Sequence, residues 1–351
     1  MKIPTSDLRS AFELCDAVES ETTFESSLFV RLTQDATELT LALAGTIWAE
    51  ARASGSEGSG KWTAYVDRRI LKAFLATARD EVQAISKDSK LMLRSGNKLE
   101  LPHRADINGY QSWKPAKKYD VPDELKRIMA AGIEYLPDTA GAEHSAAINV
   151  RTDCVIATNT LCLMGVFGAS FPENVLVPPE VAKFISKNGG KLGTDKNGVG
   201  AVTDHGTLYQ TRSSHLDNYP LANVQKHLAA AVKWPTSAVV DADDLLDAVK
   251  TGTQFLLDKQ ELGLVQSVDK GLSLFIELAG GPGSQFRRVI PAAVKIPLPE
   301  IRWAVKKATP WLEFAVDVDK SAKIEIARAP GALVFRFDHQ KKQYVFLSSD
   351  L

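Results

Sequence analysis

The stretch "GKWTAYVDRRILKAFLATA" (residues 60–78) passes from a short β-like run into an amphipathic helix whose polar side is basic. Apolar residues recur there at helical spacing and predict one buried face, made of Ile70, Leu71, Phe74, Leu75 and Ala78. The cations that lie off this face are Arg68, Arg69, Lys72 and Arg79. The stretch therefore predicts a helix that buries one side and presents positive charge on the other.

Two later stretches are similar to it, "ENVLVPPEVAKFISK" (residues 173–187) and "AVKIPLPEIRWAVKK" (residues 293–307). In the earlier one, Lys183 and Lys187 stand four residues apart, on one ridge of a helix. In the later one, the cations off the apolar face are Arg302, Lys306 and Lys307. A basic helix is thus predicted three times in one chain.

The order of elements also repeats, because each third of the chain shows a helix, strands, a second helix and more strands. The opening helices are predicted at residues 6–20, 123–136 and 242–257. Alternating apolar residues after each of them, as at Leu28, Val30 and Leu32, predict half-buried hairpins. The expected fold class is α+β. Polar stretches that contain proline divide it into three repeated domains, at residues 1–119, 120–235 and 236–351.

Composition limits the possible functions. A chain of 351 residues with 44% hydrophobic and 24% charged residues is typical of a soluble protein with two or three domains. Because the formal net charge is −1, only a local concentration of Lys and Arg could attract nucleic acid. The three cysteines lack metal-ligand spacing, and no apolar run approaches the roughly 18 residues of a membrane span. We expect a soluble, cytoplasmic protein without a metal site or a disulfide framework.

The basic helices have two interpretations. A single basic helix is most simply a solvated surface. Three equivalent helices that face the same way would instead form a continuous positive surface on a nearly neutral chain. Such a surface attracts phosphates through counterion release and does not read bases. The repetition favours this second interpretation.

Several segments resemble the bacterial-type DNA polymerase III β sliding clamp family, including its phage relatives. Residues 65–103 resemble the end of the first domain of that family, with its "SG" hairpin at Ser95-Gly96 and its "LP" ending at Leu101-Pro102. "LDNYPLANV" (residues 216–224) is similar to the segment that closes the second domain, and "AVVDADDLLDAV" (residues 238–249) to the opening of the third. "QYVFLSSDL" (residues 343–351) matches the terminal segment in length and position. In order and spacing, the resemblance covers essentially the whole chain.

The resemblance implies a homodimeric ring, with helices that line a central hole and antiparallel sheets outside. Double-stranded DNA would pass through the ring, which would tether a DNA polymerase after an ATP-driven clamp loader had placed it. Neither a cofactor nor catalysis is implied. The expected lining residues are Arg68, Arg69, Lys72, Arg79, Lys126, Arg127, Lys183, Lys187, Arg302, Lys306 and Lys307.

The resemblance also implies a pocket for partner peptides between the second and third domains. By position, Thr158 and Leu163 fall in the segment that reads "TDGHRLA" in the family, and Val345, Phe346 and Leu347 fall where the C-terminal pocket residues lie. The sequence departs from the family in both segments, so we expect a different peptide preference, and the divergence favours a phage origin. The alternative for the C-terminal residues is an ordinary core or edge strand.

Other functions remain as alternatives. "GSEGSGKWT" (residues 55–63) is close to a phosphate-binding P-loop, but Trp62 stands where Ser or Thr should follow the lysine, and a strand is expected next. The aspartates at 241, 243, 244 and 247 could serve a metal-dependent hydrolase, although capping and the helix dipole explain acidic residues at a helix start. The nearer rival is a monomeric, non-ring DNA-binding processivity factor.

Overall fold

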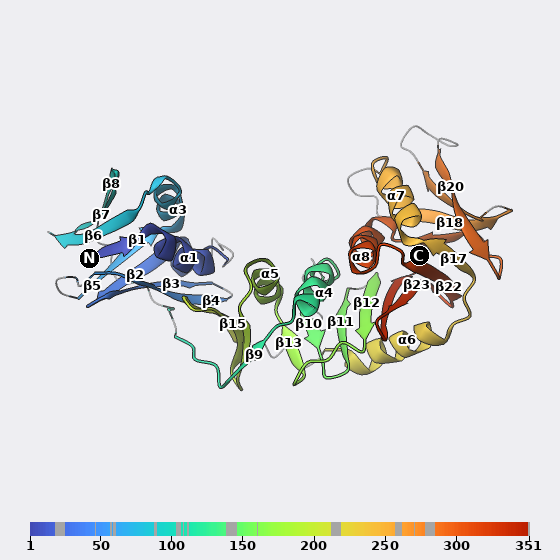
Figure 1. The fold of residues 1–351 in the computed structure, drawn as a ribbon, viewed down its shortest axis with the longest axis horizontal. Helices are drawn as coiled ribbons and strands as arrows, with labels where there is room; N and C mark the ends of the chain where they lie inside the picture. Colours follow the sequence, from blue (N-terminus) through green and yellow to red (C-terminus); the bar gives the residue numbers. More distant parts are fainter. Residues whose placement is uncertain are drawn as a thin grey trace. The chain divides into compact units, whose positions relative to one another are not determined.

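The computed structural model (Figure 1) describes residues 1–349 except 18–24, 46, 57, 59–60, 88–89, 103–106, 108, 111, 138–145, 160, 212–218, 257–261, 270 and 278–284. These residues form two compact units. Unit 1 comprises Met1–Val121 with Glu180–Arg212, and unit 2 comprises Pro122–Pro179 with Ser213–Leu351. Parts of three segments discussed above, at residues 59–60, 216–218 and 350–351, lie outside the described residues.

The elements of the first third are β1 (Lys2–Pro4), α1 (Thr5–Asp16), α2 (Glu25–Leu28), β2 (Phe29–Asp35), β3 (Glu38–Ala44), β4 (Trp48–Ser54), β5 (Trp62–Asp67), α3 (Arg68–Thr77), β6 (Glu81–Lys87), β7 (Lys90–Ser95) and β8 (Asn97–Pro102). Those of the second third are β9 (Lys117–Asp120), α4 (Asp123–Ile133), β10 (Ile148–Val150), β11 (Cys154–Thr158), β12 (Cys162–Phe167), β13 (Val175–Val177), α5 (Pro179–Asn188), β14 (Lys191–Thr194), β15 (Gly198–Val202), β16 (Gly206–Thr211) and α6 (Leu221–Lys233). Those of the last third are β17 (Ala238–Asp241), α7 (Ala242–Thr253), β18 (Gly263–Val268), β19 (Gly271–Glu277), β20 (Gln285–Val294), β21 (Ile301–Trp303), α8 (Val305–Val318), β22 (Lys323–Ala329), β23 (Ala332–His339) and β24 (Lys342–Ser349).

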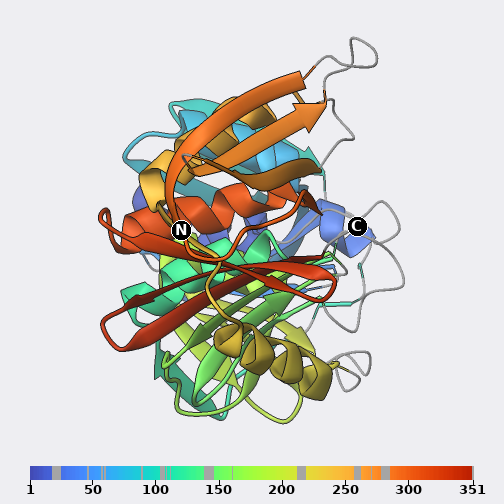
Figure 2. The ribbon, with the colours of Figure 1, turned by 90° about the vertical axis from the view of Figure 1, so that its right-hand side faces the viewer.

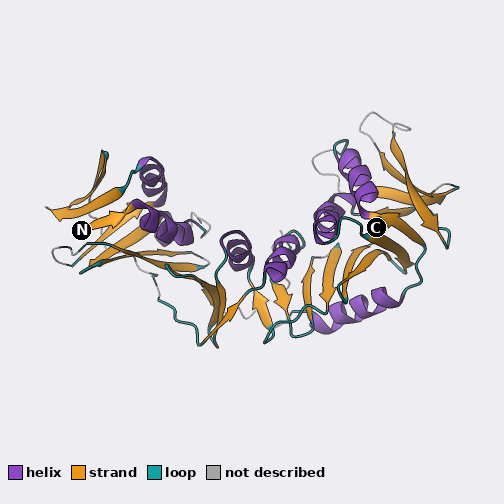
Figure 3. Cartoon of the chain, in the orientation of Figure 1, coloured by secondary structure: helices purple, strands orange, loops and turns teal. Residues whose placement is uncertain are grey.

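The predicted repeat of elements is confirmed. Apart from α2 and α6, each third reads strand, helix, four strands, helix and three strands (Figure 3). The α+β class is confirmed with it, because the helices and the antiparallel sheets alternate along the chain in every third. The domain boundaries at residues 119 and 235 stay predictions.

Each third divides its strands between two groups of four. Unit 1 contains a sheet of order β1-β6-β7-β8 and an 8-stranded sheet of order β5-β2-β3-β4-β16-β15-β14-β9. Unit 2 contains a 12-stranded sheet of order β13-β10-β11-β12-β24-β23-β22-β17-β20-β19-β18-β21. The described ladders of both units are antiparallel, as the pairs β12–β24 and β4–β16 illustrate.

Two of these ladders join one third of the chain to the next. In unit 1, β4 pairs with β16, and Trp48 lies opposite Tyr209. A side chain at Gly206 would place its Cβ 2.1 Å from the carbonyl oxygen of Glu50, so only glycine allows β16 to approach β4 at this point. In unit 2, β12 pairs with β24, and Leu163 lies opposite Leu347. We call these ladders the first junction and the second junction.

The core of unit 2 is aromatic on the face of the sheet that α4 and α8 cover. Phe346 is fully buried there, with ring centroids 5.4 Å from Tyr135, 5.9 Å from Trp311 and 5.9 Å from Phe335. The hydroxyl of Tyr135 donates to the carbonyl oxygen of Lys307 at 2.7 Å, and this contact fixes the start of α8 to the end of α4. This arrangement places the first turn of α8 close to α4.

The structure corrects two of the predicted basic helices. Residues 293–307 do not form one helix, because Ala293 lies at the end of β20 and Arg302 in β21, and α8 begins only at Val305. Helix α3 ends at Thr77, so Arg79 follows the helix instead of lying on it. Ile70, expected on the buried face of α3, is 42% exposed. The strand expected after Lys61 is present as β5.

The helices were also compared with the dimensions of a membrane. No helix in the described part of the chain is long and apolar enough to span a bilayer.

Replacing Phe346 by alanine should destabilise the protein by about 3–5 kcal/mol, because the large cavity would lie among Tyr135, Trp311 and Phe335. The midpoint of urea unfolding measures this change. Ile296→Ala is the matched control, since that side chain is 45% exposed and its loss should change stability by no more than about 0.5 kcal/mol. Equal midpoints for the two variants would contradict the core assignment.

Candidate functional site

The predicted basic residues lie on several elements. Unit 1 holds Arg68, Arg69 and Lys72 on α3 and Lys183 and Lys187 on α5, with Arg79 exposed just beyond α3. Unit 2 holds Lys126 and Arg127 on α4, Arg302 on β21, and Lys306 and Lys307 in the first turn of α8. The predicted cations thus form one set in each unit, and each set is described separately below.

A groove of about 570 Å³ in unit 1 collects part of the first set. Its walls come from α1, α3 and α5, and its apolar floor includes Phe12, Leu75 and Phe184. The charged side chains that line it are Arg9, Glu13, Asp16, Arg68, Lys72, Glu180, Lys183 and Lys187. Cations outnumber carboxylates in this groove, which therefore suits an anionic ligand with some apolar surface.

Two arginines tie α1 to α3 reciprocally. Arg9 of α1 donates from Nε to the carbonyl oxygen of Leu75 at 2.9 Å and from a terminal nitrogen to that of Ala78 at 2.8 Å, at the end of α3. Arg68, at the start of α3, donates to the carbonyl oxygen of Asp16 at 2.5 Å, at the end of α1. Each helix thereby satisfies carbonyl groups at the end of the other, where a helix lacks internal donors and favours a cation.

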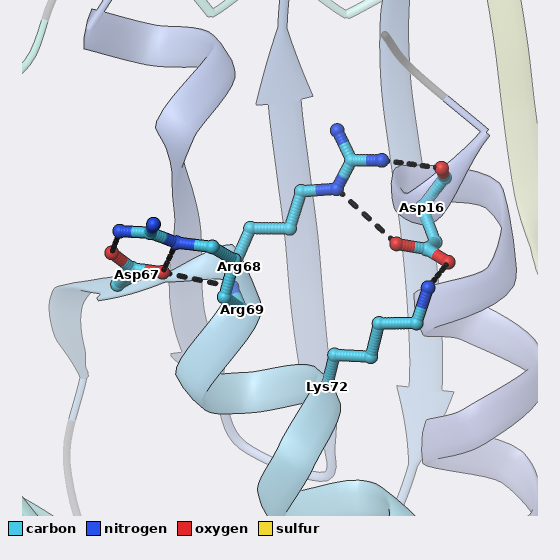
Figure 4. Close-up of polar contacts among 5 residues, drawn as sticks. All are labelled: Asp16, Asp67, Arg68, Arg69 and Lys72. Atoms are coloured by element: carbon cyan, nitrogen blue, oxygen red, sulfur yellow. Dashed lines mark hydrogen bonds and ion pairs between the residues drawn. The ribbon is translucent and has the colours of Figure 1, made fainter. Parts of the chain in front are cut away.

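Asp16 partly neutralises the cations of α3 (Figure 4). Its two carboxylate oxygens accept from Nε of Arg68 at 3.2 Å and from Nζ of Lys72 at 2.7 Å. The Arg68 side chain is only 16% exposed, whereas that of Lys72 is 63% exposed. Arg68 therefore acts mainly within the protein, and Lys72 can exchange its carboxylate partner for an external anion.

Arg69 has a carboxylate partner of its own. Asp67 caps α3 by accepting from the backbone N–H of Arg69 at 2.8 Å and also binds its guanidinium at 3.0 Å. The hydrogen bond from the Arg69 side chain holds the pKa of Asp67 below its ordinary value. At 89% exposure, the Arg69 side chain still faces solvent, so the pair leaves it accessible.

The two lysines of α5 stand differently. Both Lys183 and Lys187 are exposed, and no ion pair joins either of them to a carboxylate in the part of the chain that the structure describes. The opposite side of α5 is buried through Val181, Phe184 and Ile185, as predicted. These lysines therefore present their full charge to the groove.

The cations of unit 2 are also mixed in character. On α4, Lys126 binds Asp123 at 2.8 Å, and Arg127 reaches Asp317 of α8 at 3.3 Å. At the start of α8, Lys306 is exposed and Lys307 is half-buried. Sequence analysis missed Arg9 and the partners Asp16 and Asp317, because the pairs form between residues far apart in the chain.

The residues predicted to form a peptide pocket lie in unit 2 but do not share one surface. Leu163, Val345 and Leu347 belong to one apolar cluster, and Phe346 points to the opposite face of β24, because neighbouring residues of a strand alternate. Thr158 lies opposite Leu163 and donates to the carbonyl oxygen of Cys162 at 3.0 Å. All five are buried, and their role in binding stays a prediction.

The cluster that contains Leu163 is covered by α6, an element that sequence analysis missed. Val224, Leu228 and Ala231 of this helix are buried against the sheet. The signal was present, because Leu221, Val224, Leu228 and Val232 follow helical spacing, but the stretch that follows the helix was read as a boundary.

The groups singled out for metal or thiol chemistry have structural partners. Asp243 and Asp244 lie in the first turn of α7, Asp247 binds Arg288 at 2.5 Å, and Asp241 pairs with Lys323. Among the described residues, no three His, Cys, Asp or Glu side chains converge as a metal site requires. All three cysteines are free and buried, and burial raises the pKa of Cys15 and Cys154 to about 12.

Arg9→Ala should destabilise the protein by about 1 kcal/mol, because the carbonyl groups of Leu75 and Ala78 lose charged donors. Arg69→Ala, which removes an exposed pair with Asp67, should change stability by less than about half as much. Urea unfolding of both variants measures the difference. A loss that is no larger for Arg9→Ala would mean that the reciprocal tie contributes nothing.

The comparisons with known proteins identify the fold. No protein-family model and no curated protein matches the sequence. Among solved structures, the DNA polymerase III β subunit of Pseudomonas aeruginosa is similar, with a TM-score of 0.79 at 14% identity over 100% of both chains. The β subunit of Thermotoga maritima has a TM-score of 0.78 at 10% identity, over 100% of this chain and 98% of its own. The Helicobacter pylori β clamp has a TM-score of 0.74 at 12% identity over 100% of both chains.

Proposed function

Since the chain has the fold of DNA polymerase III β subunits, we propose that it is a DNA sliding clamp. Two copies would close a ring around double-stranded DNA and tether a DNA polymerase for processive synthesis. The observation that carries this proposal is the repeated pairing of strands at the two junctions.

The two junctions join equivalent strands. At the first, β4 is the third of its group of four strands, and its partner β16 is the last strand of the next third. At the second, β12 is again the third strand of its group, and β24 is again the last strand of the next third. The same rule predicts a third junction, between β20 and the last strand of the first third, β8.

Within one chain these two strands have open edges. Among the described strands, β8 has a neighbour on one side only, β7. Strand β20 pairs with β19 along residues 285–291, and β17 reaches only its last residues, 292–294. Open strand edges favour pairing with another chain. A second copy can therefore supply β8 to β20 and β20 to β8, which closes a ring of six thirds.

Exposed apolar side chains support the same interface. At the second junction, α4 contacts α8, and the equivalent helices of the third junction are α7 and α3. Ile70 on α3 is 42% exposed, Phe255 just after α7 is 46% exposed, and Val289 on β20 is 48% exposed. Large apolar side chains gathered on facing elements are typical of a buried subunit interface.

The cations support weak binding of the DNA backbone. Lys183, Lys187 and Lys306 are exposed, whereas Lys72 and Arg69 share their charge with Asp16 and Asp67. Phosphate contacts of this kind carry no base information, so they hold DNA without fixing a register. A ring that must slide needs weak, exchangeable contacts, and internal carboxylates weaken the contacts of α3.

The remaining functional assignments follow from the clamp proposal. The polymerase and an ATP-driven clamp loader would be its partners, the ring would act in the cytoplasm, and the chain would need neither a cofactor nor catalysis. The proposed domains are residues 1–119, 120–235 and 236–351, each holding one copy of the repeat. Arg79, Lys126, Arg127, Arg302 and Lys307 complete the proposed DNA-facing set.

Light scattering should give a molar mass near twice 38.2 kDa for the wild-type protein. Ile70→Asp and Val289→Asp should each shift the protein to monomers at micromolar concentration, because a carboxylate would be buried in the interface. Ile296→Asp, at an equally exposed apolar residue outside the proposed interface, should leave the mass unchanged. A wild-type monomer at every concentration would contradict the ring and favour a monomeric processivity factor.

Lys183→Gln with Lys187→Gln should weaken association with duplex DNA and reduce the slope of log K against log salt by roughly 2 contacts' worth. Fluorescence anisotropy across a salt series measures both quantities. Lys320→Gln with Lys341→Gln removes the same charge from exposed turns and should leave the slope as in the wild type. An unchanged slope in the first variant would remove α5 from the DNA-facing surface.

A further inference from the structure

Helix α6 is the one longer element among those described that the repeat does not require. It lies on the face of the second junction opposite to α4 and α8 (Figure 2). At the first junction, the corresponding apolar face of Val202 and Tyr209 is covered by Trp113 from an extended linker. A tryptophan is enough to cover one junction, so the helix at the other has a further reason to be there.

The face beneath α6 is shaped for an aliphatic helix. It is lined by Ile156, Leu163, Val334, Val345 and Leu347, which come from four neighbouring strands. Gly165 of β12 leaves room for Leu228, because a Cβ at that position would lie 2.6 Å from the Leu228 side chain. The sheet therefore offers a seat for one leucine, at a defined place on an otherwise continuous apolar surface.

Helix α6 is held at one end only. Arg336, which is buried, donates to the carbonyl oxygens of Ala231 at 3.0 Å and Val232 at 2.7 Å, at the end of the helix. Arg336 also binds Glu325 at 2.8 Å, and although burial raises the pKa of this carboxyl, hydrogen bonds from Thr236 and Arg336 hold it below the ordinary value. The first turn begins at Pro220, without a side-chain cap and without an acidic residue.

We propose that α6 is a displaceable occupant of this face, and that a partner protein binds there with an aliphatic segment of the same spacing. The proposal rests on the proposed function, since the partner would be one that a clamp recruits to DNA. Its anchors would match Leu221, Val224 and Leu228, with the leucine seated over Gly165. A helix of 13 residues is only marginally stable by itself, so α6 unfolds when it leaves the sheet and does not compete in solution.

Leu163, Val345 and Leu347, assigned to peptide binding by resemblance, are all beneath α6. A partner cannot reach them while the helix is seated. The apparent affinity for the partner is therefore the intrinsic affinity reduced by the fraction of molecules in which α6 is released. Contacts of α6 thus regulate recruitment without forming part of the partner's binding surface.

A fluorescein-labelled synthetic peptide of residues 221–233 is a suitable probe, because its side chains fit this face. Leu228→Glu in the full-length protein should release α6 and bind the peptide at least about tenfold more tightly than the wild type does. Ala229→Glu is the matched control, since the neighbouring side chain is exposed and its substitution should leave peptide affinity as in the wild type. Equal affinities for the two variants would overturn the proposal.

Hydrogen exchange of the wild-type protein tests the same proposal without a substitution. The backbone amides of α6 should exchange at least about tenfold faster than those of β12 and β24, and equal protection would overturn the proposal. Association of the same proteins with duplex DNA separates the two hypotheses. Absent DNA binding by the wild type would contradict the clamp, whereas normal DNA binding with unchanged peptide affinity would contradict only the role of α6.

Discussion

The architecture depends on main-chain pairing between the last strand of one third and the third strand of the preceding one. At the second junction, six residues of β12 lie opposite six of β24, from Cys162 with Ser348 to Phe167 with Gln343. This ladder holds α4 and α8 on one face of a continuous sheet and gives α6 its seat on the other. The open edges of β8 and β20 matter because the same pairing has been satisfied twice within the chain.

The basic surface is moderated by the protein itself. Arg68 and Arg9 spend most of their donors on the ends of neighbouring helices, and Asp16 accepts from both Arg68 and Lys72. The lysines of α5 have no such partner in the described chain and keep their charge. Basic residues that looked equivalent in sequence thus divide into those that build the helix pair and those that are available to an anion, which agrees with a surface that holds DNA loosely.

Local patterns predicted more of the fold than of the site. The order of elements, the buried faces of α3 and α5, and the alternating strands were all visible as periodicity, because the pattern repeats over a few residues. The same reasoning failed at residues 293–307, where a proline-bearing stretch forms the end of β20, β21 and the start of α8. It also missed α6, whose apolar spacing was interpreted as a domain boundary.

The sequence by itself determined that this protein repeats one α+β arrangement three times and places cations on equivalent helices. Only the tertiary structure decided which cations are free, since Asp16 meets Arg68 and Lys72 across more than fifty positions of the chain. It also decided that Phe346 faces the core while Val345 and Leu347 lie beneath α6. The physical reason is that periodicity encodes which side of an element is buried, whereas the partner on that side depends on how distant elements pack.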